Sequence, residues 1–167
     1  KGIGPALVEQ LISNDLVNNM ADLYYLKQKE LISLERIGQK SSQNILTALE
    51  KSKNNSLAKL LFALGIRFVG STVAKTLARH FKNLNSIKSA NIEALMAVDE
   101  IGERIAQSVH DYFRNEKYVK MLQRLQDAGL QFEFETSDEL VSDSISGKKI
   151  VVSGVFSKYS RKEIKTL

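Results

Sequence analysis

Four glycines recur along the chain at nearly regular intervals, and each could present backbone amides to an anion. They are Gly4, Gly38, Gly70 and Gly102, separated by 34, 32 and 32 residues. Each follows a branched apolar residue and directly precedes a run with helical periodicity. The first amides of a helix are unpaired and lie at the positive end of the helix dipole. We expect each glycine to take a positive φ and to let a phosphate approach those amides closely.

The residues around these glycines repeat at helical spacing. The positions directly before the glycines hold Ile3, Ile37, Val69 and Ile101; the positions three residues after them hold Leu7, Ser41, Val73 and Ile105; the positions seven residues after them hold Leu11, Ile45, Leu77 and Val109. Offsets of three and seven lie on one face of a helix. Each unit therefore predicts a helix, a short apolar hairpin and a second helix. Tetratricopeptide arrays have a similar period, but they bury their small residues between helices, whereas here the glycine stands in the turn.

A longer duplication relates the first two units to the last two. Residues 20–38 resemble residues 84–102 at a shift of 64, with Leu31 matching Leu95. Such a duplication predicts two similar halves that stack on one shared, continuous core. The expected fold class is mainly α.

Charge is unevenly distributed along the chain. The net charge of +5 includes a central block, residues 39–88, with nine basic side chains and a single acidic one, Glu50, for a balance of +8. This block indicates a polyanionic partner, although a solvated lysine-rich helix surface would carry the same charge. The chain has no cysteine, which excludes disulfides and thiolate metal sites. Its longest apolar runs are too short to span a bilayer, so no membrane partner is expected.

The four units resemble helix-hairpin-helix motifs, whose hairpin follows the pattern apolar–x–apolar–Gly. The hairpins fall at residues 2–4 (GIG), 35–38 (ERIG), 67–70 (RFVG) and 99–102 (DEIG). The resemblance implies binding to the backbone of duplex DNA. Contacts from amide donors carry no sequence information, because they do not reach the base edges.

The expected backbone contacts are the hairpin residues and the polar side chains beside them. They are Gly2, Ile3, Gly4, Ile37, Gly38, Lys40, Ser41, Arg67, Val69, Gly70, Ser71, Thr72, Lys75, Arg79, Ile101, Gly102 and Arg104. By charge, units two and three are the better candidates. Acidic residues surround the fourth hairpin, and Arg104 is the only base beside them, so this unit has either a structural or a binding role.

The helical pattern ends near Leu130. Residues 1–132 are expected to form the helix-hairpin-helix domain, 133–146 an acidic linker, and 147–167 a strand and a helix. The stretch "GKKIVVSGVF" resembles the opening of a BRCT domain. In larger BRCT families a Ser/Thr-Gly pair at this place can hold a phosphate, and Ser153 and Gly154 match it. We favour the alternative, a structural strand end.

This order of modules resembles the C-terminal region of the bacterial NAD-dependent DNA ligases. "LERIGQKSSQNILTALEKSK" and "LLFALGIRFVGSTVAKTLARHF" are typical of that family. The resemblance implies a cytoplasmic bacterial enzyme that seals nicks in DNA replication and repair. It also implies that NAD, Mg and a four-cysteine Zn module are handled upstream, so no cofactor is expected in this chain. The expected partners are nicked duplex DNA and the upstream ligase domains. Since the chain begins at Lys1 on a glycine turn, we expect it to be a piece of a longer protein.

Other classes remain open on the residues alone. One is another repair or recombination protein with duplicated hairpins, such as a nuclease subunit or a junction-binding protein. A second is a helical scaffold that binds an acidic protein. A free-standing enzyme is disfavoured, because no nucleophile, base or metal set is clustered, and His80 and His110 are isolated.

The first testable expectation concerns ligation. The family's adenylated lysine lies in a K-x-D-G motif, which this sequence lacks. Incubated with nicked duplex, NAD and magnesium, the chain should join no ends on a denaturing gel. Sealing by a preparation shown to be free of host ligase would contradict the assignment of catalysis to other domains.

Overall fold

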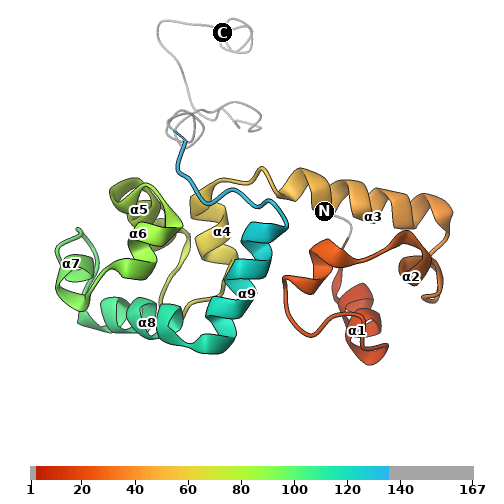
Figure 1. The fold of residues 1–167 in the computed structure, drawn as a ribbon, viewed down its shortest axis with the longest axis horizontal. Helices are drawn as coiled ribbons and strands as arrows, with labels where there is room; N and C mark the ends of the chain where they lie inside the picture. The colour runs from red at the N-terminus through yellow and green to blue at the C-terminus, as the bar shows by residue number, and fades with distance from the viewer. Residues whose placement is uncertain (1–2, 136–167) are drawn as a thin grey trace, which may run out of the picture. The chain divides into compact units, whose positions relative to one another are not determined.

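The computed structural model describes residues 3–135, so Gly2, residues 136–167 and the expected BRCT opening with Ser153 and Gly154 lie outside the described residues. Within residues 3–135 the chain forms nine α-helices and one 3-10 helix, with no β-strand (Figure 1). The elements are α1 (Pro5–Ser13), η1 (Asp22–Tyr25), α2 (Gln28–Ile32), α3 (Gln39–Ser52), α4 (Leu57–Ala63), α5 (Ser71–Phe81), α6 (Leu84–Ser89), α7 (Ile92–Met96), α8 (Glu103–Arg114) and α9 (Glu116–Asp127).

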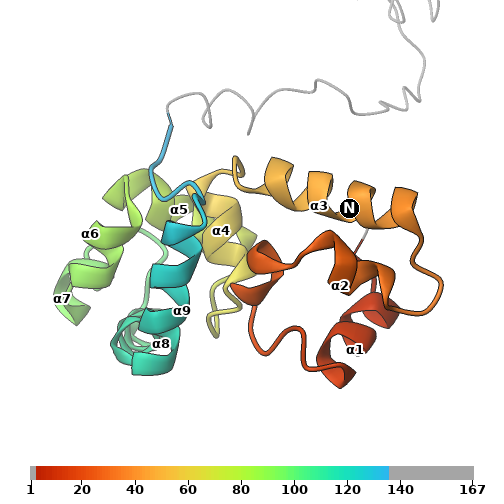
Figure 2. The ribbon, with the colours of Figure 1, turned by 45° about the vertical axis from the view of Figure 1, so that its right-hand side comes forward.

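Three helical pairs correspond to the predicted units two, three and four. Helix α2 packs against α3, α4 against α5, and α7 against α8, while α1 is the second helix of unit one. Helix α6 packs against α5 and α8, and α9 packs against α8. Figures 1 and 2 show α1 to α3 gathered in one half and α4 to α9 in the other. The mainly helical class is therefore confirmed for the described part of the chain.

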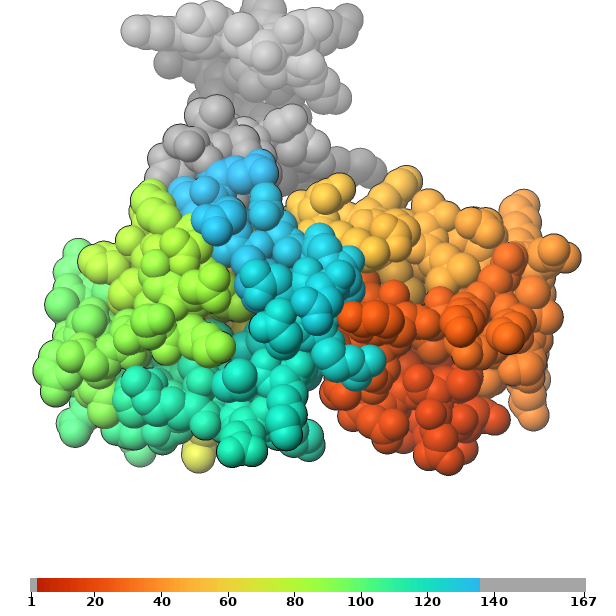
Figure 3. Space-filling model, in the orientation of Figure 1, coloured from red at the N-terminus to blue at the C-terminus, as the bar shows by residue number. Residues whose placement is uncertain are grey.

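The buried residues form two clusters, which corrects the expectation of one continuous core. The first cluster holds Leu7, Leu11, Val17, Leu26, Leu31, Leu34, Ile45 and Leu49. The second is centred on α4 to α9 and also takes in Ala21 from the first half. Each pair of units buries its own apolar faces, and the half-buried Tyr24 packs against both clusters. In Figure 3 the red-to-orange residues of the first half border the cyan residues of α9.

The second helix of each complete motif turns a small residue toward the core four positions after its glycine. These residues are Ser42, Ala74 and Ala106, all completely buried. The residues seven positions after the glycines are buried, as predicted. Of the residues three positions after them, Val73 and Ile105 are only half-buried and Ser41 is exposed. The hydroxyl of Ser42 donates to the Gln39 carbonyl, 2.8 Å away, so this buried polar group keeps a hydrogen-bond partner.

The packed region continues past α9. The Leu84 amide donates to the Phe132 carbonyl at 2.9 Å, and the Phe134 amide donates to the Lys82 carbonyl at 2.7 Å. Phe134 also packs against the second cluster. The segment that follows α9 is thereby held beside Lys82 and the start of α6 as far as Phe134.

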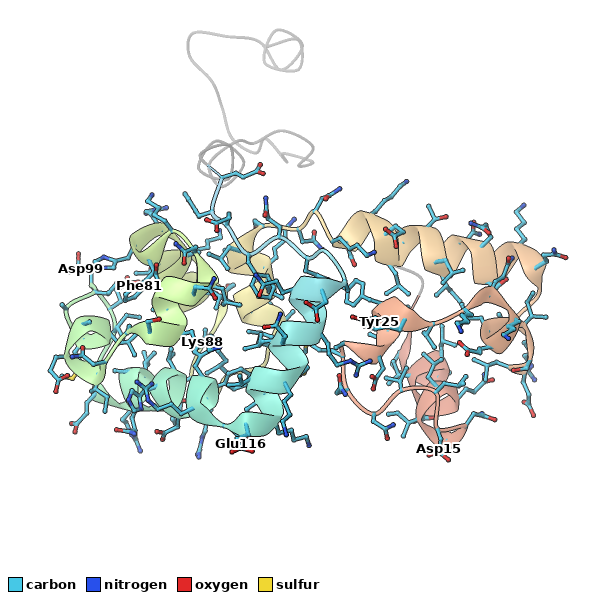
Figure 4. All side chains as sticks on the ribbon, in the orientation of Figure 1. Asp15, Tyr25, Phe81, Lys88, Asp99 and Glu116 are labelled. Atoms are coloured by element: carbon cyan, nitrogen blue, oxygen red, sulfur yellow. The ribbon has the colours of Figure 1, made fainter. Side chains whose placement is uncertain are left out.

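A charged contact joins the two halves at η1 and α9. The carboxylate of Asp22 accepts from the amides of Asn18 and Asn19, at 2.8 and 2.9 Å, and from the Arg124 guanidinium. Tyr25, labelled in Figure 4, donates its hydroxyl to the Arg124 carbonyl at 3.0 Å. Burial alone would raise the pKa of Asp22, but these three donors together hold it below the ordinary value.

We expect Asp22→Asn to lower the free energy of unfolding by about 1 kcal/mol at neutral pH, because the charge-assisted bonds weaken. A depressed folded-state pKa stabilises the fold above the unfolded-state pKa. The difference between the variant and the natural chain should therefore be largest above a pH of about 4 and disappear as the pH falls through the folded-state pKa.

Chemical denaturation followed by circular dichroism across this pH range measures the effect. Glu9→Gln is the matched control, since Glu9 lies exposed on α1. Equal losses in both variants, or a difference that does not depend on pH, would contradict the structural role of Asp22.

Candidate nucleic-acid interface

The hairpins share one turn geometry. In hairpins two, three and four, the residue before the glycine donates its amide to the carbonyl three residues earlier: Ile37 to Leu34 at 3.3 Å, Val69 to Ile66 at 3.0 Å, and Ile101 to Val98 at 3.1 Å. The residue two positions before the glycine has a positive φ in each turn: 62° at Arg36, 67° at Phe68 and 66° at Glu100. A four-residue turn with a left-handed third residue therefore links the two helices.

The glycines themselves are not left-handed, which corrects our expectation. Their φ values are −99° at Gly4, −91° at Gly38, −80° at Gly70 and −79° at Gly102, all with an extended ψ. Any residue adopts this conformation. A Cβ added to any of the four would meet no atom within 4 Å. Neither backbone strain nor packing within the described residues explains why glycine stands at these positions, so the explanation lies outside the fold.

The helices that follow these glycines lack side-chain caps. Helices α1, α3, α5 and α8 start after a glycine, and no side chain accepts from their first-turn amides. The other helices of the second half are capped instead by Ser56 (α4), Asn83 (α6), Asn91 (α7) and Asn115 (α9). Because serine or asparagine caps every other helix of the second half, the bare amides set α5 and α8 apart there. They remain available to an acceptor from outside.

Within each half the two hairpins are fastened to each other in the same way. The Ser108 hydroxyl of α8 donates to the Arg67 carbonyl of the third hairpin at 2.8 Å. The side-chain amide of Gln10, on α1, donates to the backbone carbonyl of Glu35 in the second hairpin at 3.4 Å. Both donors stand six residues after their own glycine, and both acceptors three residues before the neighbouring one. Hairpins one and two thus form one pair, and hairpins three and four another.

The predicted site residues divide into two groups. Val69 and Ile101 are buried and Ile3 and Ile37 half-buried, so these residues can offer only backbone atoms. The predicted polar and charged residues near the bare amides are exposed: Lys40, Ser41, Arg67, Ser71, Thr72, Lys75 and Arg104.

Arg79 does not lie with the other predicted contacts of the third hairpin. It stands nine residues after Gly70, which places it about 13 Å along the helix axis. Its side chain lines a hollow with Asp99 and Glu100 of the fourth hairpin. Figure 4 shows Asp99 on the loop between α7 and α8. The structure therefore places Arg79 away from the first amides of α5, at a hollow that Asp99 and Glu100 also line.

Two exposed hairpin residues were missed by the sequence analysis. Arg36 and Phe68 occupy the left-handed turn position in hairpins two and three. Phe68 is 48% exposed, and the guanidinium groups of Arg67 and Arg104 lie 4.8 and 5.7 Å from its ring centre. The only signal in the sequence was Gly2, which stands at the same position before Gly4.

Neither a metal centre nor a membrane helix is found in the described part of the chain. No three His, Cys, Asp or Glu residues among those described are grouped so as to hold a metal ion. None of the described helices is both long enough and apolar enough to cross a bilayer.

Paired hairpins with uncapped helices define the class of the protein. Residues 59–122 match the family described as "helix-hairpin-helix motif", and residues 1–51 match the "SAM-like helix-hairpin-helix tandem". The chain is thus a helix-hairpin-helix protein, as the hairpin pattern predicted.

Curated relatives then specify the family. The chain is 45% identical to a DNA ligase of Oceanobacillus iheyensis and 48% identical to one of Flavobacterium johnsoniae, over 99% of its length in each case. It is also 45% identical to a DNA ligase of Bacillus subtilis (strain 168) over 98% of its length. Over nearly its whole length the chain therefore matches a helix-hairpin-helix segment of bacterial DNA ligases. It spans about a quarter, 25%, of the length of each of these relatives.

The turn geometry leads to a stability test of two glycines. Gly70→Val should change the free energy of unfolding by less than about 1 kcal/mol, because its φ suits any residue and its surroundings are empty. Gly65→Val should cost about 1–3 kcal/mol, because Gly65 has a φ of 66°. Thermal melts of both variants measure the difference. Equal destabilisation would mean that Gly70 serves the fold after all.

Proposed function

We propose that this chain is the module with which a bacterial NAD-dependent DNA ligase grips the backbone of nicked duplex DNA. The observation that carries the proposal is the set of uncapped helix starts behind outward-facing glycines. Such amides need an acceptor, and the open space at each glycine admits one. A phosphate satisfies both conditions, since it is anionic and accepts several N–H bonds at once.

The pairing of hairpins favours a long, regular polyanion over a free anion. Two phosphate-binding turns held together in each half suit a molecule that offers phosphates repeatedly, as duplex DNA does. The basic balance of +8 over residues 39–88 agrees with such a partner. Contacts of this kind hold the duplex in register without reading its sequence, so the proposed binding is sequence-independent.

Hairpins two and three are proposed to supply most of the affinity. Arg36 and Lys40 flank the second, while Arg67 and Lys75 flank the third. The fourth presents Asp99, Glu100 and Glu103, which repel a phosphate. Its helix nevertheless begins with the same bare amides, so it can still make a weaker contact.

Catalysis is assigned to other parts of the ligase. In this proposal the NAD, magnesium and zinc chemistry belongs to upstream domains of the same protein, in the bacterial cytoplasm. Residues 147–167 are the proposed start of a BRCT domain. The described residues position the duplex, so that the nick stays within reach of the catalytic domain.

Anisotropy titrations on nicked duplex test the binding mode. If four to five phosphates are neutralised, log K should fall against log salt with a slope of about −4. Gly70→Val should weaken binding more than Gly102→Val, because its side chain blocks the approach to the more basic hairpin. Lys75→Ala should flatten the slope by about one unit, and more than Arg79→Ala, because Arg79 lies two helical turns or more from the first amides of α5.

Because Gly70→Val is expected to keep the fold, a loss of binding reports on the interface alone. Stronger damage from Gly102→Val would make the acidic fourth hairpin a principal contact. Unchanged binding in all four variants would exclude the hairpins as the DNA-binding surface.

A further inference from the structure

Phe68 occupies a turn position where the fold does not require an aromatic residue. The position two residues before the hairpin glycine holds Gly2, Arg36, Phe68 and Glu100 in the four units. It is left-handed at Arg36, Phe68 and Glu100. The same turn therefore forms around a basic, an acidic or an aromatic side chain. A positive φ is costly for a bulky residue, and nearly half of this ring faces solvent. Two cation–π contacts, from Arg67 and Arg104, cover part of the ring and leave the rest open to a partner.

The ring is also held in place by both hairpins of its pair. Arg67 precedes it in the third hairpin, and Arg104 reaches it from the first turn of α8. The hydrogen bond from Ser108 to the Arg67 carbonyl fixes the backbone beside the ring. Phe68 is thus an exposed apolar surface flanked by two cations.

Such a surface matches a chain in which anions alternate with apolar groups. Phe68 lies two residues before Gly70, so their Cα atoms are within about 7.6 Å. A phosphate bound at the α5 amides would therefore bring its neighbouring sugar close to the ring. Arg67 and Arg104 would reach the phosphates on either side of that sugar, where guanidinium groups bind best.

We propose that Phe68 packs on a deoxyribose at the edge of the minor groove and thereby selects DNA over RNA. This inference rests on the proposed binding of duplex DNA. A ribose would place its 2′-hydroxyl in the minor groove, against the ring. The hydroxyl would lose water and find no acceptor on an apolar surface, which disfavours binding.

The experiment compares two nicked duplexes of one sequence, one all DNA and one with a ribonucleotide strand. The natural chain, Phe68→Gly and Phe62→Ala are titrated against both by anisotropy. Glycine removes the ring and suits the positive φ, so the fold is preserved. Phe62 is the control, since it is 55% exposed but lies on α4, outside the hairpins.

We expect Phe68→Gly to weaken binding to all-DNA duplex about fivefold, as for a partly buried aromatic ring. Its affinity for the ribonucleotide duplex should change less than twofold, so the preference for DNA shrinks. A preference that depends only on groove shape would survive in Phe68→Gly. Phe62→Ala should leave both affinities unchanged.

The outcomes separate this inference from the proposed function. If the natural chain binds duplex DNA but Phe68→Gly weakens binding to both duplexes equally or to neither, Phe68 does not select DNA over RNA, and the proposed binding to the DNA backbone stands. If the natural chain binds neither duplex, the proposed function itself fails.

Discussion

Amide groups left unpaired at the starts of four helices are the feature on which the rest of the structure depends. A helix cannot satisfy its own first amides, and a protein normally covers them with a side chain. Here glycine stands at the capping position of α1, α3, α5 and α8, the second helix of each motif. The buried or half-buried apolar residue before each glycine and the buried residue seven positions after it anchor the turn to the core. The core therefore fixes the direction in which the amides point.

The pairing of hairpins turns four local sites into two larger ones. Gln10 makes the hydrogen bond between paired hairpins in the first half, and Ser108 makes it at the equivalent position of the second half, although glutamine is long and serine short. Different side chains serving the same contact argue that the contact matters more than the residue. Each pair has its own core beneath it, and the contact of Asp22 with Arg124 joins the halves. Spacing within a pair is thus set by packing, and the link between pairs by a few polar groups.

The sequence predicted the repeating units and the starts of their second helices, because glycine spacing and apolar periodicity are local signals. It did not predict which turn residue is left-handed. Arg36, Phe68 and Glu100 share no property that marks them, and glycine at the neighbouring position misled the assignment. The buried Ser42, Ala74 and Ala106 were also missed, since small residues carry little weight in an apolar pattern. The two separate cores and the place of Arg79 depend on contacts distant in sequence, which periodicity cannot reveal.

The second pair of hairpins shows why charge read along the chain differs from charge at a site. Arg104 belongs to the acidic fourth unit, yet its guanidinium lies over Phe68 of the third hairpin. Arg79 belongs to the basic third unit, yet it lines a hollow with Asp99 and Glu100 of the fourth. In this pair, each unit thus has an arginine that lies near residues of the other unit. Since exposed charges are screened within about 8 Å at physiological salt, a phosphate bound as proposed would respond to the charges gathered around it in space. Under the proposed function, those charges come from both hairpins of a pair and not from one hairpin alone.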